Sequence, residues 1–156
     1  MRTRFLLVVL VVSVPSVGWG IENLASKAAI SASGRRDAGY DSRFVADGEI
    51  PNAGSKDERL EVWCLRQHIA KDAWLSFQWQ EPVEIASVVY WGRSTSDHDN
   101  FSSCKVFLDG DREAIASVPL AKGTQAQVIA LPRKVTARSM RLVEQVYRAA
   151  GSGEDQ

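Results

Sequence analysis

The chain has 156 residues, which is enough for one domain of ordinary size with one hydrophobic core. Its 19 basic residues balance 19 acidic ones, and no stretch concentrates the basic residues into a patch. A chain of this kind has no electrostatic reason to bind nucleic acid or anionic lipid, so composition argues against both as partners.

The N-terminus has the three parts of a secretory signal peptide. Two arginines form a positive start, Phe5 to Val14 is a short apolar run, and Gly18 and Gly20 suit a signal peptidase. A bilayer span requires about twenty apolar residues, and this run is shorter, which favours a signal peptide. The alternative is an uncleaved membrane anchor. We expect residues 1–20 to be a signal peptide cleaved at Gly18 or Gly20. The mature protein is then secreted, extracellular or periplasmic, with no insertion in the membrane.

Export determines how the two cysteines are interpreted. Cys64 and Cys104 would enter an oxidising compartment, where an even number of cysteines favours a disulfide between them. The alternative is two buried thiols that never meet. A zinc site is not expected, because the histidines are His68 and His98 and no paired spacing exists.

Short segments with period-two alternation, or rich in β-branched and aromatic residues, fill the rest of the chain. Pro82 and Pro132 are expected to end strands, and Asp109-Gly110 is expected to form a hairpin turn. Leu142 to Ala150 is ambiguous between strand and helix. The expected strands are Ala29 to Ser33, Trp74 to Trp79, Ile85 to Trp91, Lys105 to Leu108, Ala114 to Val118, Gln127 to Leu131 and Ser139 to Val143.

Short strands separated by regular turn signals predict an all-β fold, a β-sandwich or jelly roll, over residues 21–147. Residues 148–156 form a flexible tail or a linker. Two long connections remain, Gly34 to Trp63 and Ser94 to Ser103, and loops of a rigid sandwich are where binding residues are expected.

Six motifs together resemble a known family. NLASKAAISASG, FVADGEI, Trp63, WLSFQWQEPVEIASVVYWGR, KVFLDGD and ARSMRLV follow one another in the order seen in discoidin domains, also called coagulation factor 5/8 type C domains. The resemblance extends from Glu22 to about Val146. It implies the galactose-binding-like jelly roll, which the carbohydrate-binding modules of this group share.

The resemblance also implies a structural calcium ion. Asp47 lies in the motif that matches the family's Asp-Gly turn, where an aspartate and backbone carbonyls hold calcium in many members. Calcium takes six to eight oxygen ligands, and Asp57 or Glu58 could supply more of them. The alternative is that these acidic side chains are simply solvated. The threonine that many relatives carry beside the tryptophan is missing here, since Glu61 and Val62 precede Trp63.

The loop after Trp91 is the expected ligand site, because loops at one end of the sandwich bind sugars in carbohydrate-binding members. Aromatic rings stack on the apolar face of a pyranose, and planar polar groups bind its hydroxyls. Arg93, His98, Asn100 and Phe101 supply both types, and Arg93 matches the family's Gly-Arg position. The alternative is that Phe101 turns inward as an anchor, that His98 is an ordinary exposed histidine, and that the neighbouring aspartates only form turns.

No catalytic set is recognisable. The many acidic residues have no spacing typical of a glycosidase pair, and no nucleophile-elbow motif is present. The sequence therefore predicts a secreted, non-catalytic module whose partner is a glycan or a component of the cell surface or matrix. Two alternatives remain open: an adhesion or assembly module that binds a protein, and an accessory N-terminal domain of a larger secreted enzyme.

Overall fold

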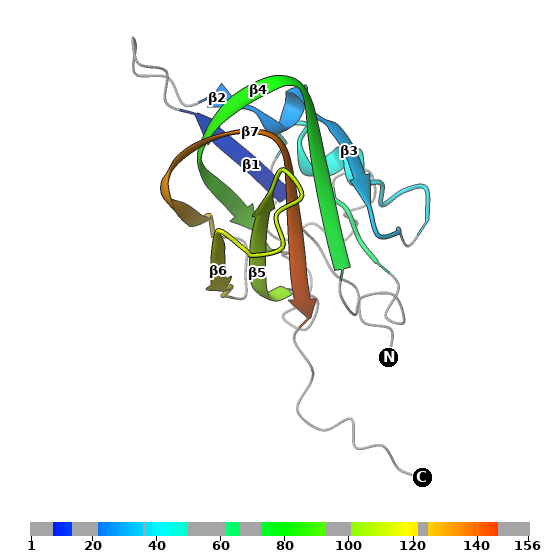
Figure 1. Cartoon of the computed structure of the whole chain (residues 1–156). Coiled ribbons are helices and arrows are strands. Elements are labelled where there is room, and N and C mark those ends of the chain that lie inside the picture. Colours follow the sequence, from blue (N-terminus) through cyan, green and yellow to red (C-terminus); the bar gives the residue numbers. More distant parts are fainter. Residues whose placement is uncertain are drawn as a thin grey trace.

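A computed structural model describes residues 8–13, 22–35, 37–49, 62–65, 73–92, 101–121 and 125–146. This part of the chain is built from antiparallel strands and two short 3₁₀ turns, with no α-helix (Figure 1). The strands are β1 (Val8–Ser13), β2 (Glu22–Asn23), β3 (Ala29–Ala32), β4 (Ala73–Trp91), β5 (Phe101–Leu108), β6 (Ala116–Pro119) and β7 (Gln127–Val146); the turns are η1 (Ala25–Lys27) and η2 (Ser42–Val45).

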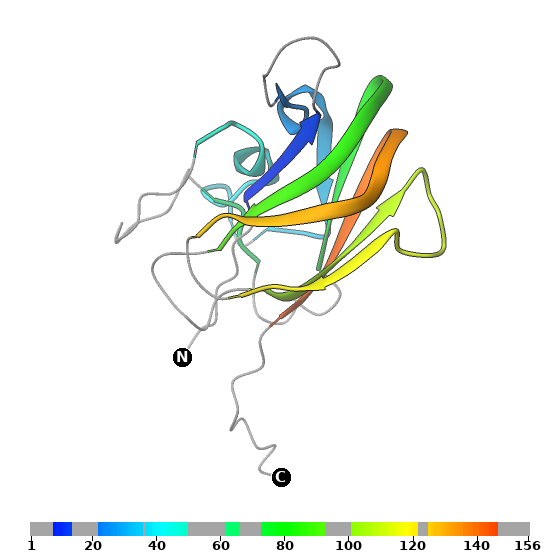
Figure 2. The ribbon, with the colours of Figure 1, turned by 90° about the vertical axis from the view of Figure 1, so that its left-hand side faces the viewer.

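The strands pair in the order β2-β1-β4-β7-β5-β6, and β3 pairs with the first part of β4. One layer of the sandwich contains β3, β5, β6, the start of β4 and the end of β7. The other contains β1, the end of β4 and the start of β7. Figures 1 and 2 show β4 and β7 bending together from one layer into the other. We call the first layer the front layer and the second the back layer.

Two reciprocal bulges produce this bend. Residues 79–82 of β4 lie opposite Arg138 of β7, and residues 131–134 of β7 then lie opposite Ala86 of β4. Unpaired residues on one strand bend it and increase its twist. Pro82 and Pro132 lie within these two stretches, where no ladder hydrogen bond requires an N–H donor. The expectation that each proline ends a strand was therefore wrong, because both lie at the corner of a continuous strand.

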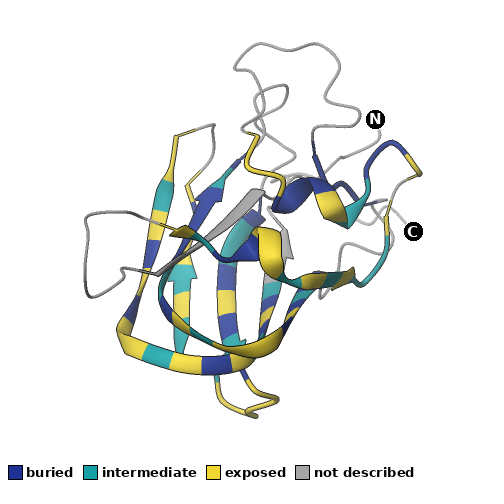
Figure 3. Cartoon of the chain, turned by 90° about the horizontal axis from the view of Figure 1, so that it is seen from above, coloured by how far each residue is buried: buried dark blue, intermediate teal, exposed yellow. Residues whose placement is uncertain are grey.

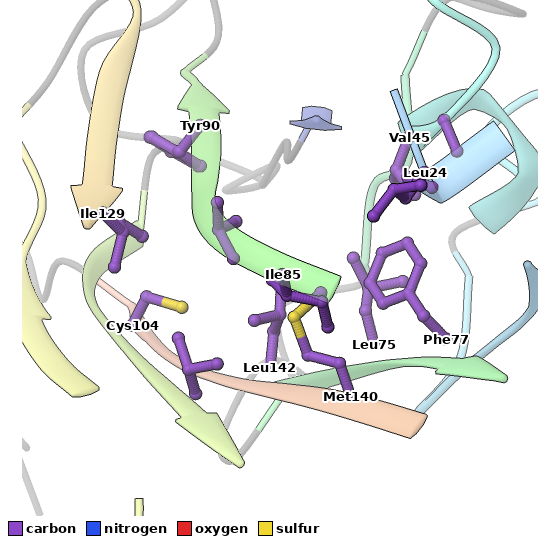
Figure 4. Close-up of a cluster of buried hydrophobic side chains, with 14 of the residues drawn as sticks. Leu24, Val45, Leu75, Phe77, Ile85, Tyr90, Cys104, Ile129, Met140 and Leu142 are labelled. Carbon is purple, nitrogen blue, oxygen red and sulfur yellow. The ribbon is translucent and has the colours of Figure 1, made fainter. Parts of the chain in front are cut away.

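The core fills the space between the layers. In β4, Leu75 and Phe77 face inward from the front layer while Val88 and Tyr90 face inward from the back layer. Figure 4 shows Leu75, Phe77 and Ile85 beside Met140 and Leu142 in this core, and Figure 3 shows the alternation of buried and exposed residues along the strands. Fully burying an aliphatic side chain contributes about 1.5–3 kcal/mol, so this core is the main source of stability.

The segments before β4 close one side of the core. Leu24 and Val45, which flank or belong to the 3₁₀ turns, are buried against the main cluster. The indole of Trp79 donates a hydrogen bond to the carbonyl of Leu24 over 2.8 Å. Trp79 and Phe77 both belong to the core, since both are buried and their rings are stacked with centroids 6.4 Å apart.

The hairpin expected at Asp109-Gly110 is confirmed. β5 pairs with β6 from Val106 opposite Ala116 to Ser103 opposite Pro119. Asp109 and Gly110 have φ values of 45° and 80°, so both residues adopt the left-handed conformation that tight hairpin turns require.

The predicted disulfide and the predicted signal peptide have different outcomes. The disulfide between Cys64 and Cys104 is not formed: Cys64 is a buried thiol in a small cluster with Tyr40 and Val62, whereas Cys104 is a buried thiol facing the main core. The signal peptide stays a prediction, and in the structure of the whole chain its residues Val8–Ser13 form β1 at the edge of β4. Among the described residues, no helix has the length and apolar character to cross a membrane.

Candidate functional site

The expected ligand loop connects the two layers at one end of the sandwich. β4 ends at Trp91 in the back layer, and β5 begins at Phe101 in the front layer, opposite Val146. Arg93, His98 and Asn100 lie outside the described residues, so their roles stay a prediction. The described residues show instead how the two ends of this rim loop (residues 93–100) are held.

Phe101 anchors the rim loop from below. Its side chain is 0% exposed and stacks on Trp63, which is also 0% exposed, with ring centroids 6.1 Å apart. The indole of Trp63 donates a hydrogen bond of 2.8 Å to the carbonyl of Gly34. The prediction that Phe101 binds ligand is corrected here: a ring buried on this scale has no exposed face on which a sugar could stack, and its inward alternative is what the structure shows.

The other end of the rim loop is held by a second group of apolar residues. Gly92 is buried, and Trp91 packs against the cluster of Tyr40, Val62 and Cys64. The last described residues before the rim loop are therefore packed against a support.

The expected calcium ligand, Asp47, lies in the turn after η2. Its Oδ1 accepts a hydrogen bond of 3.0 Å from the N–H of Glu49, and Gly48 between them has a φ of 88°. Burial, reinforced by the nearby charge of Glu49, raises the pKa of the Asp47 carboxyl despite that hydrogen bond. The charged carboxylate is therefore under-compensated, which is the electrostatic setting in which a bound cation would be favourable.

An open pocket of about 290 Å³ lies beside Asp47, between the two 3₁₀ turns. No motif in the sequence marks this pocket, whose walls come from segments about fifteen residues apart. Its polar lining includes Ser26, Ser42 and Asp41. The full lining is Ala25, Ser26, Ala28, Ile30, Asp41, Ser42, Arg43, Ala46 and Asp47.

The fit to calcium can be tested on these residues. Asp47 brings one carboxylate, and the Ala46 carbonyl lies next to it, with only a long contact of 3.5 Å from the Asn23 amide. Within the described ranges, no three acidic, histidine or cysteine side chains gather into a metal-binding group. Asp47 and the Ala46 carbonyl could supply two of the oxygen ligands that calcium requires, and the pocket has room for water molecules, each of about 30 Å³, to supply others. Asp57 and Glu58 lie outside the described residues.

Asp41 differs from Asp47 although both line the pocket. Burial opposes ionisation of Asp41, yet the Arg43 N–H and the Arg35 guanidinium outweigh it and lower the pKa of this carboxyl. Asp41 also caps η2, since its Oδ1 accepts the Arg43 N–H over 3.2 Å. Its charge is thus already compensated by the protein, and Asp47 remains the better cation ligand of the two.

The chain matches a protein family over most of its length. Residues 23–152 match the family described as "Domain of unknown function (DUF7402)". No curated protein matches the chain.

Solved structures show the same fold at low sequence identity. A family 32 carbohydrate-binding module of Clostridium perfringens NanJ, solved with galactose, has a TM-score of 0.58 at 12% identity and covers 81% of this chain and 87% of its own. The module CpGH89CBM32-5 of the same organism, solved with GalNAc-β-1,3-galactose, has a TM-score of 0.61 at 14% identity, covering 80% and 87%.

A third example is chitosan-binding module 2 from a chitosanase/glucanase of Paenibacillus sp. IK-5, solved with chitotriose. Its TM-score is 0.55 at 18% identity, and the match covers 82% of this chain and 91% of that one. At these identities the likeness concerns the fold. It confirms the expected all-β, galactose-binding-like jelly roll of family 32 modules and discoidin domains.

Proposed function

This chain belongs to the DUF7402 family, and we propose that it is an exported, non-catalytic module that binds carbohydrate through the rim loop. The observation that carries the proposal is the support beneath that loop: both ends rest on buried aromatic clusters at an end of a galactose-binding-like sandwich. Modules with this fold were solved with galactose, with GalNAc-β-1,3-galactose and with chitotriose, which supports a glycan as the ligand class.

In this proposal, the guanidinium of Arg93 donates paired hydrogen bonds to sugar hydroxyls, with His98 and Asn100 completing the polar contacts. Phe101 holds the end of the loop by stacking on Trp63 and does not stack on the sugar. A single shallow site of this kind gives weak binding, roughly millimolar to micromolar, unless several modules act together. The calcium ion proposed at Asp47 would stabilise the scaffold and would not touch the sugar.

The test is glycan-array screening of the purified full chain, followed by calorimetry with the best ligands. Arg93→Ala is expected to weaken binding at least tenfold, because the lost paired hydrogen bonds to a charged donor are among the stronger polar contacts. Arg112→Ala is the matched control, since Arg112 is an exposed arginine in the β5–β6 connection. Equal affinity of both variants would place the ligand elsewhere, and binding only to proteins, insensitive to free sugar, would reject a glycan ligand.

A further inference from the structure

The front layer presents a second surface, away from the rim. Alternation along its strands sends Leu75, Phe77, Leu142 and Val106 into the core, so the residues between them face outward. We call these outward positions the outer face. Its described members are Ser31 of β3, Trp74, Ser76 and Gln78 of β4, Ser139, Arg141 and Val143 of β7, Ser103, Lys105 and Phe107 of β5, and Ser117 of β6.

The strand register places aromatic and basic residues of the outer face side by side. Phe107 lies directly opposite Arg141, and Arg141 lies opposite Ser76. In the adjacent row, Trp74 lies opposite Val143, and Val143 lies opposite Lys105. Residues opposite or diagonal to each other on neighbouring strands are about 5–8 Å apart, so these side chains form one continuous patch.

Within this patch, the guanidinium of Arg141 lies 5.0 Å from the centroid of the Trp74 ring. Such a cation–π contact orients the guanidinium and contributes to holding it parallel to the face. Trp74, Phe107 and Val143 are half-buried, and Lys105 and Arg141 are exposed. The aromatic and aliphatic side chains are therefore closer to the sheet than the charged groups, which are more exposed to solvent.

The charge of the outer face is one-sided. Its described positions include two cations, Lys105 and Arg141, and no carboxylate. Asp109 lies at the corner of the face, but its Oδ1 already accepts the N–H groups of Arg138 and Ser139, each over 2.8 Å, and the Ser139 hydroxyl over 3.3 Å.

Cations near the bend of the sheet are arranged differently. Lys134 pairs with Glu84 over 3.0 Å, and Arg138 pairs with Glu81 over 3.5 Å. In the part of the chain that the structure describes, no carboxylate pairs with Lys105 or Arg141. As far as its described residues go, the outer face is thus a positive patch without the ion pairs found near the bend of the same sheet.

We propose that the outer face binds an acidic polysaccharide, one whose sugars carry carboxylate or sulfate groups. Arg141 and Lys105 would bind the anionic groups, Phe107 and the exposed edge of Trp74 would pack against pyranose rings, and the serines would bind hydroxyls. Lys105 and Phe107 are four and six positions beyond Phe101 along β5, or roughly 13 and 20 Å from the rim, so the cationic and aromatic groups of this surface are separate from the site proposed above.

The experiment compares polymers that differ in one property. Affinity electrophoresis of the full chain would use polygalacturonate, dextran sulfate, uncharged dextran and polyglutamate. Retention by one or both acidic polysaccharides, with at least tenfold weaker binding to dextran and polyglutamate, is expected, and which acidic polymer binds identifies the anionic group. Equal retention by polyglutamate would overturn the proposal, because it would show that charge suffices without sugar rings. Failure of both acidic polysaccharides to bind would overturn it as well.

Variants assign the binding to the face. Lys105→Gln with Arg141→Gln is expected to weaken binding to the acidic polysaccharide at least tenfold, whereas Arg112→Gln with Arg133→Gln removes the same net charge from other exposed sites and should change it less than twofold. Phe107→Ser should weaken binding without changing net charge. Thermal unfolding of each variant verifies folding. If Arg141→Gln destabilises the sheet, the single variant Lys105→Gln, at an exposed residue, replaces the double variant in the binding assay. Equal loss in the control pair would overturn the proposal. Arg93→Ala should leave binding of the acidic polysaccharide intact. If this variant abolished that binding, the rim loop would be the polymer site and the outer-face proposal would be overturned. If Arg93→Ala lowered only the binding of the rim loop's own sugar ligand, the outer-face proposal would stand.

Discussion

Two aspartates on the wall of one pocket have opposite electrostatic roles. The ionised form of Asp41 is stabilised by an arginine and a backbone N–H, while the ionised form of Asp47 is disfavoured by burial. Asp41 thus contributes stability above its unfolded-state pKa, and that contribution is lost as the pH falls through its lowered folded-state value. For Asp47 the sign is reversed: the folded protein holds the proton more tightly, so its ionisation reduces stability as the pH rises through its raised folded-state pKa.

A bound cation would remove that penalty at Asp47. In EDTA, Asp47→Asn is therefore expected to leave the free energy of unfolding at pH 7 unchanged or slightly higher. In calcium at one hundred times its Kd, the parent chain should gain about 2.7 kcal/mol and the variant should gain much less. Urea unfolding with and without calcium measures both. An equal gain in Asp47→Asn would show that any calcium site lies elsewhere, and Glu113→Gln, at an exposed acid in the β5–β6 connection, controls for general charge effects.

At the scale of single elements, the turn between β5 and β6 is fastened to a third strand. Asp109 Oδ1 accepts two N–H groups from β7 while its own backbone takes a left-handed conformation. The Asp109 side chain therefore accepts N–H groups of β7 at the place where β7 lies opposite the bulge of β4. The same contacts hold the hairpin against the bend of β7. Asparagine tolerates positive φ and retains a side-chain oxygen, whereas alanine offers neither property.

We expect Asp109→Ala to lower the free energy of unfolding by about 1–3 kcal/mol, since two backbone donors lose their acceptor and a residue with positive φ gains strain. Asp109→Asn should lose clearly less. Chemical denaturation of both variants beside the parent chain measures the difference. Equal losses would show that the negative charge, and not the acceptor or the backbone conformation, is what the turn requires.

Elements also show where sequence reasoning succeeded and where it failed. The alternation in residues 74–79 and 139–143 and the Asp-Gly signal identified real strands and a real hairpin, because these patterns act within one or two strands. Phe101 was misplaced because a register shift lies between Phe101 and Ser103. That bulge puts Phe101 and Cys104, three residues apart, on the same buried side, so simple alternation could not reveal it.

The same limit applies to the sites. Asp47 was singled out by its motif, and the rim loop was singled out by the strands on either side of it; the roles of both stay predictions. The outer face could not, because Trp74, Lys105, Phe107 and Arg141 come together only through the pairing of β4, β7 and β5. Their spacing along the chain gives no sign of this neighbourhood. The proline corners were equally hidden, since a proline in an unpaired stretch looks locally like a strand end.

At the scale of the whole molecule, the two layers are not independent units, because β4 and β7 run through both of them. Removing a buried side chain from either layer should therefore destabilise the same transition. Leu142→Ala in the front layer and Ile129→Ala in the back layer are each expected to cost about 2–5 kcal/mol, with the slope of denaturant unfolding unchanged. Val128→Ala, at a residue 66% exposed beside Ile129, is the control and should cost less than 1 kcal/mol.

Tryptophan fluorescence and far-UV circular dichroism should give coincident curves for all three variants, as two-state unfolding requires. Separate transitions, with Ile129→Ala shifting one and Leu142→Ala the other, would mean that the bend acts as a hinge between two folding units instead of a shared corner.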